Sequence, residues 1–419
     1  GILAVFLGVF SVFLKRILYF IKQHRIVISI LCFLIISLNF LWFVMSKKTI
    51  LFDKKIIILG FDGLSPQIMG NMMQKNLLPN FSKLKKKGTY SRLATTIPSQ
   101  SPIAWAGFAT GKNPGKHGIY SFIQRNPSTY SLDISLTNFK YGKPQKVLKQ
   151  KTLWEYTSNY NIPNVIITPP VSFPPPKISG KIISGMGVPD ILGTQGTFTF
   201  YTSEANKKKK ESQGNIFFVK KRKSMFLKII GPKVSNLKQK NENITILFQV
   251  KIIDDKNVKI KYQQKEFVLE KGKWSDWKKV IFKISWLKKI SGIFKFLLIE
   301  TEPEFKLYIS PINYDPKKPL FNISYPSDYS KNLAENIGLF YTQGMPMATW
   351  PVNENILPQD LFIEQVNEIL TEKSAMYRLE LNKFQNGLLF CYFESPDIIQ
   401  HMFWNYIDPE HPLYEKNSK

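Results

Sequence analysis

Three short stretches of the chain are mostly apolar, show no polar alternation and are rich in β-branched or aromatic residues. A continuous apolar run of this length is typical of a strand buried on both faces of a sheet. The three runs are residues 54–59, 164–167 and 388–393. Helical patterns stand between them, at residues 66–88 with a break at Leu78-Pro79, at residues 105–109, and from Leu153 onward. This order predicts a parallel sheet covered by helices on both faces.

A different pattern begins after about residue 203. Residues 205–310 carry lysine-rich alternation, as at 244–250 and 258–262, with turn signals between the runs. Such alternation predicts an antiparallel β insertion with one face in water. Trp274 and Trp277 lie in this region, and we expect them to pack in a core rather than stack on a ligand. Helical patterns return at 327–340 and 359–384.

The start of the chain has the pattern of a membrane anchor. Residues 26–45 contain no charge, and twenty helical residues span roughly 30 Å, one hydrocarbon core. Trp42 near one end and Lys47-Lys48 after it are typical of a membrane boundary. Residues 1–14 are also apolar and suggest a second span or an interfacial helix. A signal peptide is the alternative, but the run is long and lacks a small-residue cleavage site. Similar numbers of lysines and arginines flank the run, so its orientation is undecided.

These patterns divide the chain into four parts. Residues 1–48 are a membrane anchor of one or two helices, and residues 49–204 are the first part of an α/β core. Residues 205–311 are the β-rich insertion, and residues 312–419 are the second part of the core.

The net charge of +28 raises the question of nucleic-acid binding. The lysines are spread along the whole chain, and no compact basic helix or aromatic RNA-binding signature is present. We therefore expect no nucleic-acid partner and favour attraction to anionic lipid. Two cysteines, Cys32 and Cys391, exclude a disulfide scaffold and a cysteine-rich zinc module.

The first candidate site residue is Asp62, inside Gly60-Phe61-Asp62-Gly63 directly after the first strand. Ligand sites of parallel sheets lie beyond the carboxyl ends of the strands. A carboxylate placed there, with glycines giving access, suits a zinc ion or a harder divalent cation. An Asp beside Gly is also a common turn, so the motif alone does not establish a metal ligand.

A hydroxyl is the second candidate. Ser101 precedes Pro102 and a short helix, where it would be a helix N-cap with its hydroxyl at the positive end of the helix. The functional interpretation is a nucleophile whose pKa is lowered by a metal. Thr96 and Ser99 are rival hydroxyls, and spacing does not choose among the three.

The third candidate pair is Asp397 and His401, just after the last strand. Their i, i+4 spacing places carboxylate and imidazole on one face of a helix, where they could give one metal two ligands. The plain alternative is a capping Asp with a partly buried His.

Taken together, the chain resembles the type I phosphodiesterase/nucleotide pyrophosphatase family of the alkaline phosphatase superfamily, and most closely its predicted phosphohydrolase or phosphomutase branch. The resemblance covers roughly residues 55–202 and 312–414. The motifs that carry it are Gly60-Phe61-Asp62-Gly63, Ile97 to Pro102, Thr110-Gly111 with Pro114 and His117-Gly118, Gly185 to Asp190, Gly196 to Thr202, Phe340 to Pro346, and Asp397 to Tyr414.

The resemblance implies an alkaline phosphatase-like three-layer α/β/α sandwich, here with the β-rich insertion and the N-terminal transmembrane segment or segments. It also implies two divalent metal ions, zinc by preference or manganese, and a serine nucleophile at Ser101. One metal would be held by Asp62 and Ser101, the other by Asp397 and His401. His117 belongs to a matched motif, but we expect a structural role for it. The substrate would be a small-molecule, lipid or glycan phosphate ester, and the resemblance favours an extracytoplasmic site.

One departure from the family affects these expectations. The family completes its metal sites with an Asp-His pair and a further His after the Asp397/His401 element, and the sequence to Lys419 contains neither. Asp408 and His411 do not replace them, so we expect incomplete metal sites in this stretch of chain.

Two alternatives stay open. The first is a phosphoryl or phosphoethanolamine transferase or mutase on the same scaffold. The second is a membrane-bound binding protein without catalysis. A sulfatase is disfavoured, because Ala104 and Trp105 stand where its signature requires other residues.

Overall fold

The computed structural model describes residues 15–16, 19, 23–24, 33–34, 36–38, 52–204, 212–234, 242–285 and 288–414. The chain divides into two units, Gly1–Leu51 and Phe52–Lys419. Most of the predicted span at residues 26–45, and the whole apolar run at 1–14, lie outside the described residues. Among the residues that are described, we find no helix with the length and apolarity that crossing a bilayer requires.

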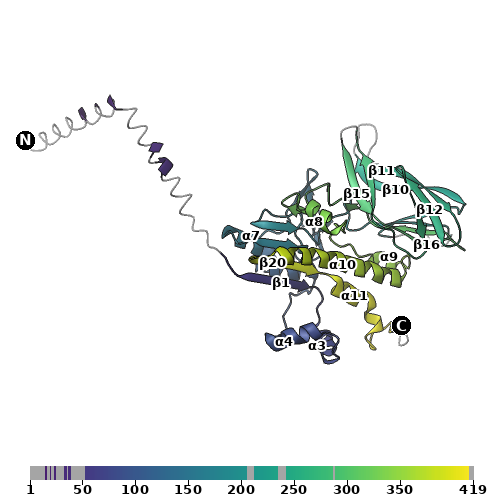
Figure 1. Cartoon of the computed structure of the whole chain (residues 1–419), viewed down its shortest axis with the longest axis horizontal. Helices are drawn as coiled ribbons and strands as arrows, with labels where there is room; N and C mark the ends of the chain where they lie inside the picture. The colour runs from purple at the N-terminus through teal and green to yellow at the C-terminus, as the bar shows by residue number, and fades with distance from the viewer. Residues whose placement is uncertain are drawn as a thin grey trace, which may run out of the picture. The chain divides into compact units, whose positions relative to one another are not determined.

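The three predicted apolar strands lie in one sheet of five strands (Figure 1). Its order is β1 (Lys55–Phe61), β20 (Gly387–Phe393), β6 (Asn164–Ile167), β7 (Gly180–Ile183) and β19 (Ser324–Tyr325). The first four strands are parallel to one another, and β19 is antiparallel to β7. The prediction of a parallel sheet is confirmed, with β20 buried along its whole length.

Residues 54–59 lie in a strand as predicted, but the prediction that this strand is buried on both faces is wrong. Strand β1 is an edge strand, and Ile56, Ile57 and Leu59 are 45%, 43% and 41% exposed. A β-branched run indicates a strand of a parallel sheet, but its place in the sheet depends on which other segments pair with it.

Helices cover both faces of the sheet. Ala109 of α5 (Ser101–Thr110) and Trp154 of α7 (Leu153–Asn159) pack on one face, where the strands contribute residues such as Phe390. Leu333 of α8 (Tyr329–Ile337) and Met376 of α10 (Gln359–Lys383) pack on the opposite face. The chain is therefore a mixed α/β protein, consistent with an alkaline phosphatase-like fold.

The other helices are short. The predicted break at Leu78-Pro79 separates α3 (Pro66–Gln74) from α4 (Pro79–Lys87), each beginning with a proline at its first position. The rest are α6 (Pro114–His117), α9 (Thr349–Asn353), α11 (Ser395–Phe403) and a 3₁₀ turn at Trp404–Tyr406. Two small hairpins, β2 (Ile123–Arg125) with β3 (Leu132–Ile134) and β4 (Asn138–Lys140) with β5 (Lys143–Gln145), follow α6.

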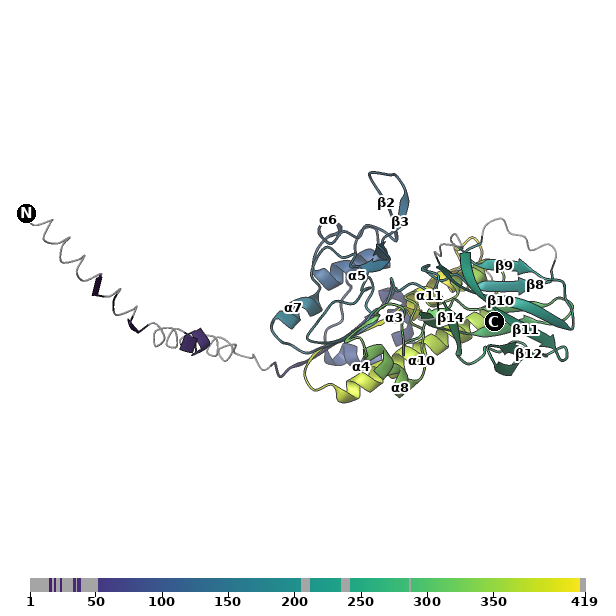
Figure 2. The ribbon, with the colours of Figure 1, turned by 90° about the horizontal axis from the view of Figure 1, so that it is seen from above.

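The alternating stretch forms three sheets together with residues 199–202 and 313–314 on either side of it, and Figures 1 and 2 show them at one end of the sheet-and-helix core. The pairing is antiparallel as predicted except between residues 199–202 and 215–218, which are parallel. One contains β10 (Ser224–Val234), β11 (Glu242–Ile252), β12 (Asn257–Tyr262) and β13 (Lys265–Glu270), all antiparallel. The second contains β14 (Lys278–Lys283), β15 (Lys289–Phe294) and β18 (Asn313–Tyr314). The third contains β16 (Phe296–Glu300), β17 (Lys306–Ile309), β8 (Thr199–Thr202) and β9 (Asn215–Phe218).

Both tryptophans of this strand-rich region contact helix α10. Trp274 Nε1 donates to the Leu361 carbonyl at 2.9 Å, and Trp277 Nε1 donates to Glu372 Oε1 at 3.1 Å. An ion pair between the buried Lys295 and the partly exposed Glu368 also joins the strand-rich region to α10. These bonds and the surrounding apolar cluster give both indoles a role in packing, as expected from the sequence.

Candidate functional site

A cleft opens at the carboxyl ends of β1 and β20. Asp62 follows β1, Ser101 begins α5, and Asp397 lies in the first turn of α11 after β20; all three line the cleft. Adjacent parallel strands bring Asp62 and the start of α11 to the same edge, with the Asp62 N–H bonded to the Phe393 carbonyl at 2.9 Å. Residues up to 335 positions apart in sequence thus meet at one place.

The Asp62 carboxylate is held by two donors that sequence reasoning missed. Trp105 Nε1 donates to Asp62 Oδ1 at 2.9 Å, and the Tyr392 hydroxyl donates to Oδ2 at 2.6 Å. Asp62 is 8% exposed. Burial, and then the negative charge of Asp62, raise the pKa of the Tyr392 hydroxyl well above its usual value, so it stays a donor. The carboxylate is therefore fixed in orientation before any ligand arrives.

The glycines around Asp62 provide space for its neighbours. A Cβ on Gly60 would stand 2.5 Å from Cη2 of Trp105, the residue that bonds Asp62. A Cβ on Gly63 would stand 2.7 Å from Cα of Asp397, and Gly63 also has a φ of +62°. The Gly-Phe-Asp-Gly motif thus lets an indole and a second carboxylate approach Asp62.

Ser101 is the first residue of α5, not its cap. Gln100 is the N-cap and makes no side-chain capping bond, so the prediction that Ser101 is the N-cap is wrong. The Ser101 hydroxyl makes no hydrogen bond to any group of the described chain. Of its rivals, Thr96 bonds the Pro98 carbonyl at 3.0 Å, and neither Thr96 nor Ser99 lines the cleft.

Asp397 and His401 lie on one face of α11, as their spacing predicts. His401 Nε2 is 3.5 Å from Asp397 Oδ1, but the imidazole is 75% exposed and does not line the cleft. Burial, and then the charge of Asp62, raise the pKa of the Asp397 carboxyl, while His401 lowers it. The carboxylates of Asp62 and Asp397 are therefore close enough to repel each other.

Two further charged residues were not predicted. Glu394 lines the cleft beside Asp397. Lys373 of α10 forms a nearly buried ion pair with Glu394. Helix α10 carries no motif around Lys373, so only the packing of α10 against β20 reveals the pair. His117 is fully buried, its Nδ1 accepts from the Ile119 N–H at 3.2 Å, and it lies outside the cleft.

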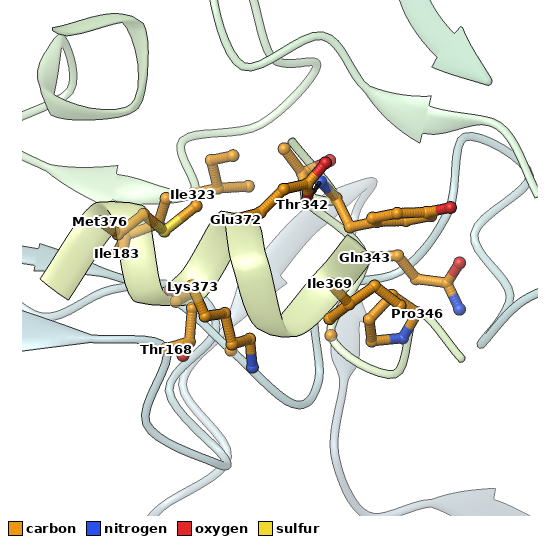
Figure 3. Close-up of a pocket in the computed structure, with 14 residues that line it drawn as sticks. Thr168, Ile183, Ile323, Thr342, Gln343, Pro346, Ile369, Glu372, Lys373 and Met376 are labelled. Carbon is orange, nitrogen blue, oxygen red and sulfur yellow. Dashed lines mark hydrogen bonds between the residues drawn. The ribbon is translucent and has the colours of Figure 1, made fainter. Parts of the chain in front are cut away.

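A smaller cavity adjoins the cleft and shares Gln343, Gly344 and Pro346 with it (Figure 3). Glu372 of α10 lines this cavity and accepts from the Tyr341 N–H at 2.9 Å. Burial is the main cause that raises the pKa of Glu372 to about 8. Figure 3 shows the amide of Gln343 directed away from Glu372.

The donors at the cleft suit a divalent cation by their chemistry. Asp62 and Asp397 offer carboxylate oxygens, Ser101 offers a hydroxyl, and a cation would offset the repulsion between the two carboxylates, which adds to burial in raising the pKa of Asp397. In the part of the chain that the structure describes, no group of three or more His, Cys, Asp or Glu side chains forms a metal cluster.

Comparison with known proteins supports the family that the motifs indicate. Residues 56–184 match the family model of type I phosphodiesterase / nucleotide pyrophosphatase, which confirms the recognition made from the motifs. The match runs from β1 through β7 and contains Asp62 and Ser101. Enzymes of this family are hydrolases of phosphoric ester bonds, generally dependent on divalent metals. No curated protein and no solved structure matches the chain.

Proposed function

We propose that this protein is a metal-dependent phosphodiesterase whose nucleophile is Ser101. The observation that carries the proposal is the cleft itself, which gathers a hydroxyl without a hydrogen-bond partner and two carboxylates at the carboxyl edge of the sheet. Ser101 stands in the first turn of α5, where helix N–H groups favour a bound anion such as phosphate. The family match of the segment that carries Asp62 and Ser101 supports the same chemistry.

The proposed reaction has two displacements. Ser101 Oγ attacks phosphorus, the bond from phosphorus to the leaving oxygen breaks, the hydroxyl proton passes to solvent, and the leaving alkoxide takes a proton from solvent. Water then cleaves the phosphoserine and restores the hydroxyl. Asp62, held by Trp105 and Tyr392, would hold one divalent cation with Ser101, and Asp397 with His401 would hold a second. Bound cations would lower the pKa of the attacking hydroxyl and offset the phosphate charge.

The deciding experiment is turnover of bis(4-nitrophenyl) phosphate by the full chain with added Zn²⁺ or Mn²⁺. Ser101→Ala should lower kcat at least about a thousandfold, because the covalent step loses its nucleophile. Ser99→Ala is the matched control and should keep wild-type turnover, since Ser99 does not line the cleft.

Loss of activity in Ser99→Ala or Thr96→Ala, with Ser101→Ala active, would refute the assignment of the nucleophile. Binding of the ester without any turnover would favour the non-catalytic alternative. A membrane location is part of the proposal and is supported by the uncharged run at residues 26–45.

A further inference from the structure

The cleft has three carboxylates and, among the described residues that line it, no lysine, arginine or histidine. The carboxylates belong to Asp62, Glu394 and Asp397. All three act on the Tyr392 hydroxyl, whose pKa is raised by burial and then by their negative charges. The chain as a whole carries 28 more positive than negative charges. The negative lining is therefore a property of the site and not of the composition.

Glu394 differs from the two aspartates because it already has a cationic partner. Lys373 Nζ of α10 donates to Glu394 Oε2, and the two side chains are 11% and 9% exposed. The same ammonium lies 5.3 Å from the centre of the Tyr392 ring. Lys373 lines the smaller adjoining cavity and not the cleft, and Figure 3 shows it leaving α10 on a different side from Glu372. The cation thus reaches the cleft only through Glu394.

The pair is unusual in this lysine-rich chain. In the other ion pairs of the described residues, apart from that of Lys295, the lysine side chain is at least 20% exposed. A nearly buried ammonium is stable only beside a compensating charge, and separating such a pair leaves one charge buried and unpaired. Glu394 is therefore held firmly by Lys373.

Glu394 has no second structural role that would explain its carboxylate. It occupies the N-cap position of α11 but makes no side-chain capping bond. Asp397, one of the proposed cation ligands, follows in the first turn of the same helix. A third free carboxylate at this position would add its charge to that of Asp62 and Asp397.

We propose that Lys373 is a positioning residue that acts through Glu394: it withholds this carboxylate from divalent cations, so that Asp62 and Asp397 alone supply the negative charge that a cation meets in the cleft. This inference rests on the proposed function, because it concerns the cations of the same site.

Zn²⁺ titration of the purified full chain, followed by calorimetry near neutral pH, tests the inference without substrate or turnover. Lys373→Met leaves Glu394 uncompensated and should bind Zn²⁺ about tenfold more tightly, because one negative charge is added near the cation. Glu394→Gln leaves the ammonium uncompensated and should bind Zn²⁺ about tenfold more weakly. The variant with both changes should return close to the wild-type affinity.

A purely structural ion pair predicts another pattern. Breaking the pair from either side would loosen the turn that carries Asp397, so both single variants would bind Zn²⁺ more weakly. That result, or an unchanged affinity in Lys373→Met, overturns the inference. Lys373→Arg keeps the charge and should bind as the wild type does. Lys295→Met removes the other buried lysine paired with α10, through Glu368, and is the matched control with no expected effect.

The comparison holds even where Lys373→Met fails to fold. Glu394→Gln and the double variant differ only in the charge at Lys373, and the double variant leaves no unpaired charge. Adding Lys373→Met to Glu394→Gln should therefore strengthen Zn²⁺ binding about tenfold. No gain in affinity would overturn the inference.

Failure of the inference and failure of the proposed function are distinguishable. Phosphodiester turnover that Ser101→Ala abolishes, with Zn²⁺ affinity shifted in the same direction by both single variants, leaves the phosphodiesterase and removes the role of Lys373. Opposite shifts of Zn²⁺ affinity in a chain without turnover do the reverse.

Discussion

At the scale of single residues, the site depends on the space that the two glycines near Asp62 provide for neighbouring side chains. Gly60 and Gly63 have no Cβ, so Trp105 and Asp397 can approach the backbone on either side of Asp62. Gly63 also adopts a φ of +62°, a conformation that disfavours any other residue. The Gly-Phe-Asp-Gly motif is therefore needed for packing around Asp62 as well as for the carboxylate that it supplies.

Gly63→Ala should destabilise the fold by more than Gly111→Ala does. Both glycines have nearly the same φ, +62° and +63°, so the backbone cost of about 1–2 kcal/mol is shared. A Cβ at Gly111 meets nothing within 4 Å, whereas at Gly63 it collides with Asp397. Overpacking should add about 1–3 kcal/mol. Urea denaturation of the two variants measures the difference, and equal losses would contradict the contact.

At the scale of elements, helix α10 connects the cleft to the strand-rich region. It carries Lys373, paired with Glu394 at the cleft, and Glu372, bonded to Trp277 from the neighbouring strands. The raised pKa of Glu372 means that the folded protein holds a proton there at neutral pH.

This proton makes a contribution to stability that depends on pH. The folded pKa of about 8 lies above the ordinary value of 4.5, so the free energy of unfolding falls as pH rises between those two values. The slope from this one group approaches about 1.4 kcal/mol per pH unit. Glu372→Gln should flatten the dependence between pH 5.5 and 8, measured by urea denaturation. An unchanged slope in the variant would show that Glu372 is ionised in the folded protein.

At the scale of the whole molecule, the residues from Phe52 onward form a unit separate from the first 51 residues. The cleft, both layers of helices and the strand-rich region belong to that second unit. The proposed membrane attachment therefore depends on the N-terminal unit, whose sequence contains the uncharged run.

We predict that the expressed full chain stays in the membrane pellet after an alkaline carbonate wash. Replacing Leu34 and Leu38 together by lysine should release most of it, because each charge near the centre of a span costs about 2.5–3.5 kcal/mol. Leu64→Lys with Leu77→Lys, two exposed positions of the second unit, is the control and should stay in the pellet. A wild-type chain found in the soluble fraction would contradict the anchor.

Local patterns in the sequence were sufficient to place three of the five strands of the parallel sheet, several helices, and the candidate acids and hydroxyl. A β-branched run, a proline after a turn and an i, i+4 pair each depend on neighbouring residues, so β6, α5 and α11 could be predicted. Family motifs then connected Asp62 with Asp397 although 335 positions separate them.

Tertiary structure alone decided which strand is an edge strand, that Trp105 and Tyr392 hold Asp62, and that Lys373 pairs with Glu394. Each of these depends on contacts between segments far apart in the chain, such as the 2.6 Å bond from Tyr392 to Asp62. Hydrophobic and polar patterns report on the local chain, whereas exposure, hydrogen-bond partners and ion-pair partners are set by whichever distant segment packs alongside.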